Sequence, residues 1–185
     1  GLKILYVKFG YDKLPFSHSS LVSAFYSPYM QRPEMLQNEL FSRRDIGLTL
    51  YRNFWKQRIN LYAGAYTGSG ESSLALENDK SGNLEYIGRA DISWPAKCKY
   101  HEIDETGVPF PVVSLGLNGR YAQKSVNSGG DFSLLTINGK KYTYGIDFMA
   151  EYHGFTALAE ADQVKAIPND TKDLLGQPTN YYRAG

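Results

Sequence analysis

The chain has 185 residues, enough for one large domain, and a formal net charge of +1. This near-neutral balance gives no bulk electrostatic attraction for nucleic acid, so no nucleic-acid partner is expected. Hydrophobic residues make up 42% of the chain and the mean hydropathy is -0.40, and no run approaches the roughly 18 apolar residues that a membrane-spanning helix needs.

The cysteine content and the start of the chain say little about the cellular compartment. Cys98 has no second cysteine with which to form an intrachain disulfide. Gly1 opens directly onto a strand-like run, so we expect no signal peptide. The chain is then either mature and trimmed or a piece of a longer protein.

In chain order, the first strand is predicted at 2–9, where β-forming residues alternate mildly. The connection 10–44 follows and carries three prolines. Within it, the run 33–40 opens with proline and continues with helix formers, which predicts a short helix. A connection this long inside a compact domain is usually functional.

The stretch 45–67 has the clearest pattern in the chain. Apolar residues alternate with small or polar ones, the pattern breaks over 53–57, and the alternation then resumes. Two such runs joined by a tight polar turn predict a β-hairpin. The turn carries Phe54 and Trp55 beside basic residues, and aromatic rings at the end of an apolar band are typical of a membrane–water interface.

Four further strands are predicted from the same period of two, at 84–94, 112–124, 141–152 and 155–166. Strand lengths near ten residues suit a tilted crossing of a bilayer. The connections tend to alternate between long and short, with 95–110 as an exception, as they do in outer-membrane barrels. We therefore predict an all-β fold, an antiparallel transmembrane β-barrel of the outer-membrane porin type, in preference to a soluble β-sandwich.

The predicted strand number has a consequence for the extent of the barrel. The principal strands number seven, whereas bacterial single-chain barrels use even numbers. Two open sheet edges would also expose unpaired backbone to lipid. Residues 1–185 are therefore expected to form a single β-barrel domain that is only part of the full barrel, unless 131–137 forms an eighth strand.

Four sequence runs then occur in a recognisable order: KFGYDKLPFS at 8–17, SRRDIGLTLY at 42–51, INLYAGAYTGSG at 59–70 and YIGRADISWP at 86–95. In this order they resemble the phosphate-selective porin O and P family of outer-membrane proteins. The resemblance implies a water-filled barrel of roughly 16 to 18 strands, commonly a homotrimer, in the outer membrane of a Gram-negative bacterium. Such a porin, surrounded by outer-membrane lipid, would pass small solutes or anions such as phosphate by diffusion.

Large barrels narrow their pores with an inward-folded loop whose charged side chains set selectivity. The long connection after the first strand is the candidate, because Lys13, Arg43 and Arg44 could draw phosphate, and arginine can hold its oxygens bidentately. The alternative is that the two arginines pair with Asp45 or Glu39 at the barrel rim.

Arg89 and Arg120 are the strongest lumen candidates, because each falls on the polar face of an alternating strand. A cross-strand ion pair with Asp91 or Glu85 would instead stiffen the wall. The predicted polar faces carry four basic and six acidic residues, namely Arg58, Arg89, Arg120, Lys124, Glu85, Asp91, Asp147, Glu151, Glu160 and Asp162. An anion-selective pore should show the reverse excess, so the sequence departs here from what the family implies.

No enzyme chemistry is expected. His18, His101 and His153 have no spacing that suggests a metal set, and the serines beside His18 do not form a nucleophile elbow. A metal cluster of His101 with Cys98 and nearby acids is the lesser alternative, so no catalytic residue, metal or cofactor is predicted. Two other functions stay open: a plugged, non-conducting accessory barrel in a larger outer-membrane complex, and a soluble β-rich binding domain.

Overall fold

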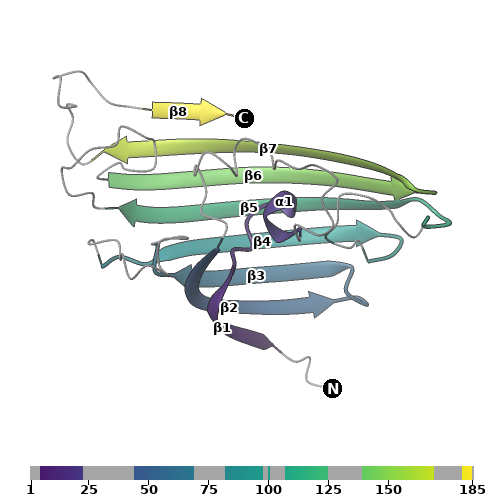
Figure 1. Cartoon of the computed structure of the whole chain (residues 1–185), viewed down its shortest axis with the longest axis horizontal. Helices are drawn as coiled ribbons and strands as arrows, with labels where there is room; N and C mark the ends of the chain where they lie inside the picture. The colour runs from purple at the N-terminus through teal and green to yellow at the C-terminus, as the bar shows by residue number, and fades with distance from the viewer. Residues whose placement is uncertain are drawn as a thin grey trace.

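A computed structural model of the chain describes residues 5–22, 44–68, 82–97, 100, 107–124, 139–168 and 181–184. These residues form one antiparallel sheet of eight strands, in which each strand pairs with its neighbours in the chain (Figure 1). The elements are β1 (Tyr6–Lys13), α1 (His18–Leu21), β2 (Arg44–Phe54), β3 (Ile59–Tyr66), β4 (Glu85–Trp94), β5 (Val112–Lys124), β6 (Gly139–Tyr152), β7 (Phe155–Pro168) and β8 (Tyr181–Ala184). Within the described part of the chain, no helix has the length and hydropathy to span a membrane.

Two tight turns join strands at the same end of the sheet. Residues 55–58 connect β2 to β3, and the three consecutive residues Trp55–Gln57 all have positive φ. His153 and Gly154 connect β6 to β7, also with positive φ, as a two-residue type I′ turn requires. These turns fix the register of the two hairpins, so alternate side chains stay on the same face from strand to strand.

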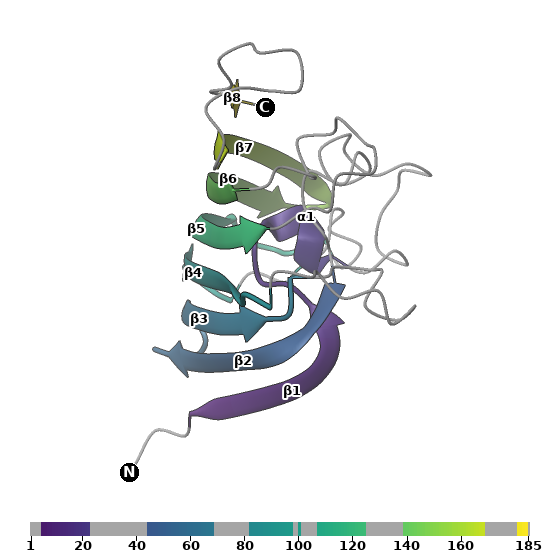
Figure 2. The ribbon, with the colours of Figure 1, turned by 90° about the vertical axis from the view of Figure 1, so that its left-hand side faces the viewer.

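The sheet is curved, and α1 lies against its concave face (Figure 2). Side chains on the concave face of β2 to β6 are buried although they are polar or charged: Asp45, Thr49, Asn60, Glu85, Arg89, Asp91, Ser93, Ser114, Asn118, Arg120, Lys141, Thr143, Asp147 and Glu151. Large apolar side chains on the convex face of β1 to β7 are exposed: Val7, Phe9, Leu48, Leu61, Tyr86, Ile92, Trp94, Val113, Leu115, Leu117, Tyr144, Ile146, Phe148, Tyr152 and Phe155. Water-soluble domains place their apolar side chains inside, so this sheet has the reverse arrangement.

A small apolar cluster also lies on the concave side. It consists of Leu14, Phe16, Tyr66, Ile87 and Val164, each at most 3% exposed. The first two come from the segment between β1 and α1, and the other three come from β3, β4 and β7. The cluster therefore seats the segment that carries α1 on the sheet, among the polar side chains.

The all-β, antiparallel prediction is confirmed, and the seven principal strands lie where the period of two placed them. β5 has its predicted bounds, and β7 continues past residue 166 to Pro168. A short eighth strand was not predicted: β8 pairs with the segment Gln163–Ala166 of β7. Its four residues are too few to show a clear alternation in the sequence.

The prediction that residues 10–44 form one long connection is wrong at both ends. β1 runs to Lys13, because the residues from Gly10 onward pair with β2, and Arg44 is the first residue of that strand. Lys13 and Arg44 are thus strand residues that face each other in register. Arg43, the helix predicted at 33–40 and the optional strand at 131–137 lie outside the described residues.

Candidate functional site

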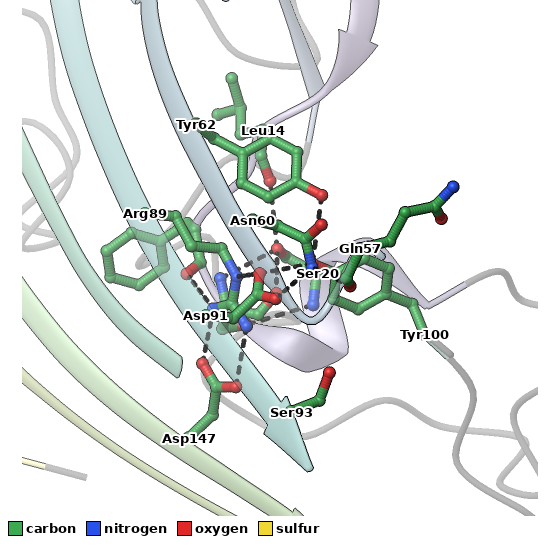
Figure 3. A network of polar contacts seen from close by, with 12 residues as sticks. Leu14, Ser20, Gln57, Asn60, Tyr62, Arg89, Asp91, Ser93, Tyr100 and Asp147 are labelled. Carbon is green, nitrogen blue, oxygen red and sulfur yellow. Dashed lines mark hydrogen bonds and ion pairs between the residues drawn. The ribbon is translucent and has the colours of Figure 1, made fainter. Parts of the chain in front are cut away.

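The centre of the concave face is an ion pair that crosses a strand (Figure 3). Arg89 on β4 donates to both carboxylate oxygens of Asp147 on β6, from Nη1 to Oδ2 at 2.5 Å and from Nη2 to Oδ1 at 2.8 Å. The two side chains are 1% and 3% exposed. A bidentate arginine–carboxylate pair that is buried in this way fixes both side chains in one geometry.

A second carboxylate extends this network towards β3. Asp91 lies two residues from Arg89 on the same strand, with its Oδ2 3.5 Å from Arg89 Nε. It accepts a hydrogen bond from Asn60 Nδ2 at 2.6 Å and another from the Tyr100 hydroxyl at 2.7 Å. The Tyr100 hydroxyl also lies 3.3 Å from that of Tyr62. The network therefore joins β3, β4 and β6 to the connection after β4.

Tyr100 belongs to this network but lies outside the sheet, in the connection after β4. Burial, followed by the negative charge of Asp91, raises the pKa of Tyr100 above its usual value. Its hydroxyl is therefore protonated at neutral pH and can donate to the carboxylate. Its ring also lies 5.9 Å from the Arg89 guanidinium and 5.5 Å from the ring of His18 on α1.

The segment 14–22, here called the inner segment, lies on this network from the opposite end of the sheet. The carbonyl oxygen of Phe16 accepts a hydrogen bond from Arg89 Nη1 at 3.0 Å. The backbone amide of Ser19 donates to Glu160 Oε1 on β7 at 2.7 Å. The inner segment and Tyr100 thus both contact Arg89, which Figure 3 shows beside Tyr100, and they come from connections at opposite ends of the sheet.

Local hydrogen bonds shape the inner segment itself. Ser17 caps α1: its side chain accepts from the amide of Ser20, and the Ser20 hydroxyl accepts from the amide of Ser17. This reciprocal arrangement satisfies two backbone donors that a helix start leaves open. Lys13 Nζ donates to the carbonyls of Leu21 and Val22, both at 2.9 Å, and so ties the end of α1 back to β1.

A second buried ion pair lies nearer the end of the sheet at which β4 begins and β5 ends. Arg120 on β5 donates from Nη2 to Glu85 Oε2 on β4 at 2.9 Å, and its Nε contacts Glu85 Oε1. The side chains are 5% and 1% exposed. On the neighbouring strands, Tyr66 and Thr49 share a hydrogen bond of 2.7 Å between their hydroxyls. The polar face is therefore a set of cross-strand pairs.

The sequence-predicted site residues take different places. Arg89 and Arg120 lie on the polar face, each paired with acids of the wall, including the partners Asp91 and Glu85 named by the alternative. Lys13 ties down the inner segment, and the Arg44 guanidinium lies 6.0 Å from the ring of Tyr11. The structure thus brings Arg89 and the inner segment together, whereas Arg120 pairs farther along the strands.

Sequence reasoning missed two elements of this site. The partnership of Arg89 with Asp147 crosses a whole strand, and its one signal was Gly116, a glycine on the polar face between them. A Cβ at Gly116 would lie 2.5 Å from Arg89 Nη2 and 2.6 Å from Asp147 Oδ2. The role of Tyr100 had no signal, because the connection that carries it shows no periodicity.

Comparison with known proteins adds no assignment. No protein-family model, no curated protein and no solved structure matches the chain.

Proposed function

We propose that this chain is a part of the wall of a transmembrane β-barrel in the outer membrane of a Gram-negative bacterium. The single observation that carries the proposal is the arrangement of the two faces of the sheet. Polar and charged side chains are buried on the concave face, and a continuous set of apolar side chains is exposed across β1 to β7 on the convex face. Exposed apolar surface on this scale marks contact with lipid or another apolar partner.

The positions of the aromatic side chains favour lipid. Tyr86, Tyr121 and Tyr142 lie side by side in register on β4, β5 and β6, near one end of the convex face. The opposite end carries exposed aromatic side chains of its own: Trp55, Trp94, Tyr152 and Phe155. Outer-membrane barrels have such aromatic girdles at both membrane interfaces.

The spacing of these two aromatic rows fits a bilayer. Tyr86 and Trp94 are eight residues apart on β4, which corresponds to about 26 Å along the strand at roughly 3.3 Å per residue. A strand tilted by about 40° covers roughly 20 Å of membrane height with this length, and the segment from Tyr86 to Trp94 has a length within the about 9–11 residues that a tilted transmembrane strand needs. Between the two rows, the convex face of β4 carries only Gly88, Ala90 and Ile92. This stretch of β4 has no charged side chain on the convex face, which supports a lipid-facing wall, and the guanidinium of Arg52 on the same face of β2 lies 4.8 Å from the centre of the Phe54 ring.

The edges of the sheet indicate that the barrel is larger than this chain. Among the described residues, β1 pairs only with β2, and β8 pairs only with β7. Unpaired backbone groups at a sheet edge are very unfavourable in lipid, so further strands are needed to complete the wall. We therefore place the chain in a full barrel with additional strands, as a single protein or as a homotrimer of such barrels.

Within this barrel, the function that we propose is passive diffusion of small hydrophilic solutes. The support is the polar concave face, which would line the interior, and the inner segment that lies on it, as in pores narrowed by an inward loop. The resemblance to phosphate-selective porins suggests anions as solutes. The acidic residues of the polar face do not favour that choice.

A second candidate is a plugged, non-conducting barrel subunit of an outer-membrane complex. One observation favours it: Arg89 and Asp147 are almost fully buried beneath the inner segment and Tyr100, so a solute could not touch them in this arrangement. The conductance of the complete protein in a planar bilayer separates the two functions. Stepwise channel currents support the porin. Silence from protein that shows heat-modifiable gel mobility, and is therefore folded, supports the plugged barrel.

A further inference from the structure

Carboxylates outnumber cationic groups where β6 meets β7 on the polar face. Asp147 on β6 lies directly opposite Glu160 on β7, and Asp162 follows two residues later on the same strand and face. Arg89 is bound to Asp147 and also lies beside Asp91. This group thus has one guanidinium among four carboxylates, and like charges on facing strands repel unless a cation lies between them.

The amide side chain of Asn118 lies beside one of these carboxylates, that of Asp162. Asn118 on β5, Gly145 on β6 and Asp162 on β7 lie in one register row. A Cβ built on Gly145 would collide with Asp162 Oδ1 and with Asn118 Oδ1, so both oxygens converge over the glycine. Asn118 is only 9% exposed, and among the described residues neither of its side-chain polar atoms has a hydrogen-bond partner. Buried amides are normally satisfied, so this one points to a missing ligand.

The chemistry of these oxygens defines the ligand. Carboxylate and amide carbonyl oxygens are the groups that hard inorganic cations prefer. No cluster of three or more His, Cys, Asp or Glu side chains that could hold a metal ion occurs among the described residues. The two oxygens over Gly145 would therefore hold a cation weakly, with water completing its shell. Weak binding is what a permeation pathway requires, because an ion must leave as readily as it enters.

We propose that Asp162 and Asn118 form a binding site for small inorganic cations on the polar face, and that this site makes the pore favour cations over anions. The binding site stands on the geometry of this row, whereas the selectivity also rests on the proposed porin function. Glu160 adds to the negative potential, although its Oε1 accepts the amide of Ser19. Phosphate would then be disfavoured at this position.

The test uses the complete protein with Asp162→Asn, and Asp12→Asn as the matched control. Asp12 lies on the same face on β1, where it pairs with the exposed Lys8, so both variants lose one negative charge from the polar face. Reversal potentials are measured in a KCl gradient in planar bilayers. We expect a cation-selective wild type, and a K⁺/Cl⁻ permeability ratio about sevenfold lower in D162N, because a unit charge roughly 7 Å away in water changes the energies of K⁺ and Cl⁻ in opposite directions by about RT each. D12N should keep the wild-type ratio.

Calcium binding to the folded, detergent-solubilised protein gives a second readout that needs no current. Calorimetric titration with CaCl2 should show binding to wild type and D12N and its loss in D162N. An anion-selective wild type, or equal shifts in the two variants, would overturn the proposal. The absence of calcium binding to the wild type would also overturn the proposal. This is the expected result if Asn118 only forms a hydrogen bond to Asp162. If the protein passes no current in the bilayer but calcium binding is lost only in D162N, the proposed porin function is wrong and the cation site is supported.

Discussion

Arg89 on β4 and Asp147 on β6 meet above Gly116 of β5, the strand that lies between them. The pair is possible only because that position has no side chain. It fastens three strands together and presents Arg89 Nη1 to the carbonyl of Phe16. One glycine therefore controls both the wall and the attachment of the inner segment.

Substitution of Gly116 by alanine should destabilise the protein. The new methyl group would lie within 2.6 Å of Asp147 Oδ2 and displace the ion pair, and overpacking of this kind costs about 1–3 kcal/mol. Urea titration in lipid vesicles, followed by tryptophan fluorescence, measures the change. Gly88→Ala on the convex face is the control, because a Cβ there meets nothing within 4 Å. Equal stability of the two variants would show that the Arg89–Asp147 pair does not depend on Gly116.

Substitution of Tyr100 by phenylalanine tests the contact between the wall and the connection after β4. It removes the donor to Asp91 and leaves the ring, so the loss should be about 1.5–3 kcal/mol, as for hydrogen bonds to charged groups. Tyr86→Phe, on the exposed convex face, should change the free energy of unfolding by less than about 0.5 kcal/mol. A loss in Y86F as large as that in Y100F would contradict the assignment.

The same variant predicts a pH dependence. The folded-state pKa of Tyr100 lies above the usual value of 10.0, so the folded state holds this proton more tightly than the unfolded state does. Its contribution is fully present below pH 10 and is lost as the pH rises above that value. The stability difference between wild type and Y100F should therefore shrink above about pH 10. A difference that stays constant across this range would show that Tyr100 has no raised pKa.

An arginine on the convex face tests the lipid contact. Leu117 is exposed on β5 halfway between the two aromatic rows, where a charge at the bilayer midplane costs about 2–4 kcal/mol. His153→Arg, in the turn beyond the aromatic row, places the same side chain in water and should cost little. If L117R folds into vesicles with wild-type stability, the convex face does not contact lipid.

Much of this fold could be predicted from the sequence, because a period of two persists through every long strand. The assignment of Arg89 and Arg120 to the polar face followed from the same alternation, as did the acidic character of that face. The end of β1 was not predicted, because Gly10 and the charged residues after it are typical of a loop. In the structure they pair in full register with β2.

The contacts of the site could not be predicted, since they depend on distances that alternation does not encode. The contact between Arg89 and Asp147 spans two strand spacings and 58 residues of chain. The capped helix α1 has four residues, too few for a helical period, and Ser17 and Ser20 read as part of a polar loop. The position of the inner segment depends on backbone groups, such as the Phe16 carbonyl, that no side-chain pattern reveals.

Spin labelling along β5 shows whether the convex face contacts lipid. Nitroxide labels are attached one at a time to cysteines at the positions from Val113 to Gly119, except Gly116, where a side chain would displace the Arg89–Asp147 pair, in a complete protein whose native Cys98 is replaced by serine. Relaxation by oxygen, which partitions into lipid, is compared with relaxation by a water-soluble nickel chelate. We expect high oxygen accessibility at Val113, Leu115, Leu117 and Gly119 and low accessibility at the labelled residues between them. High nickel accessibility at those four positions would contradict this expectation.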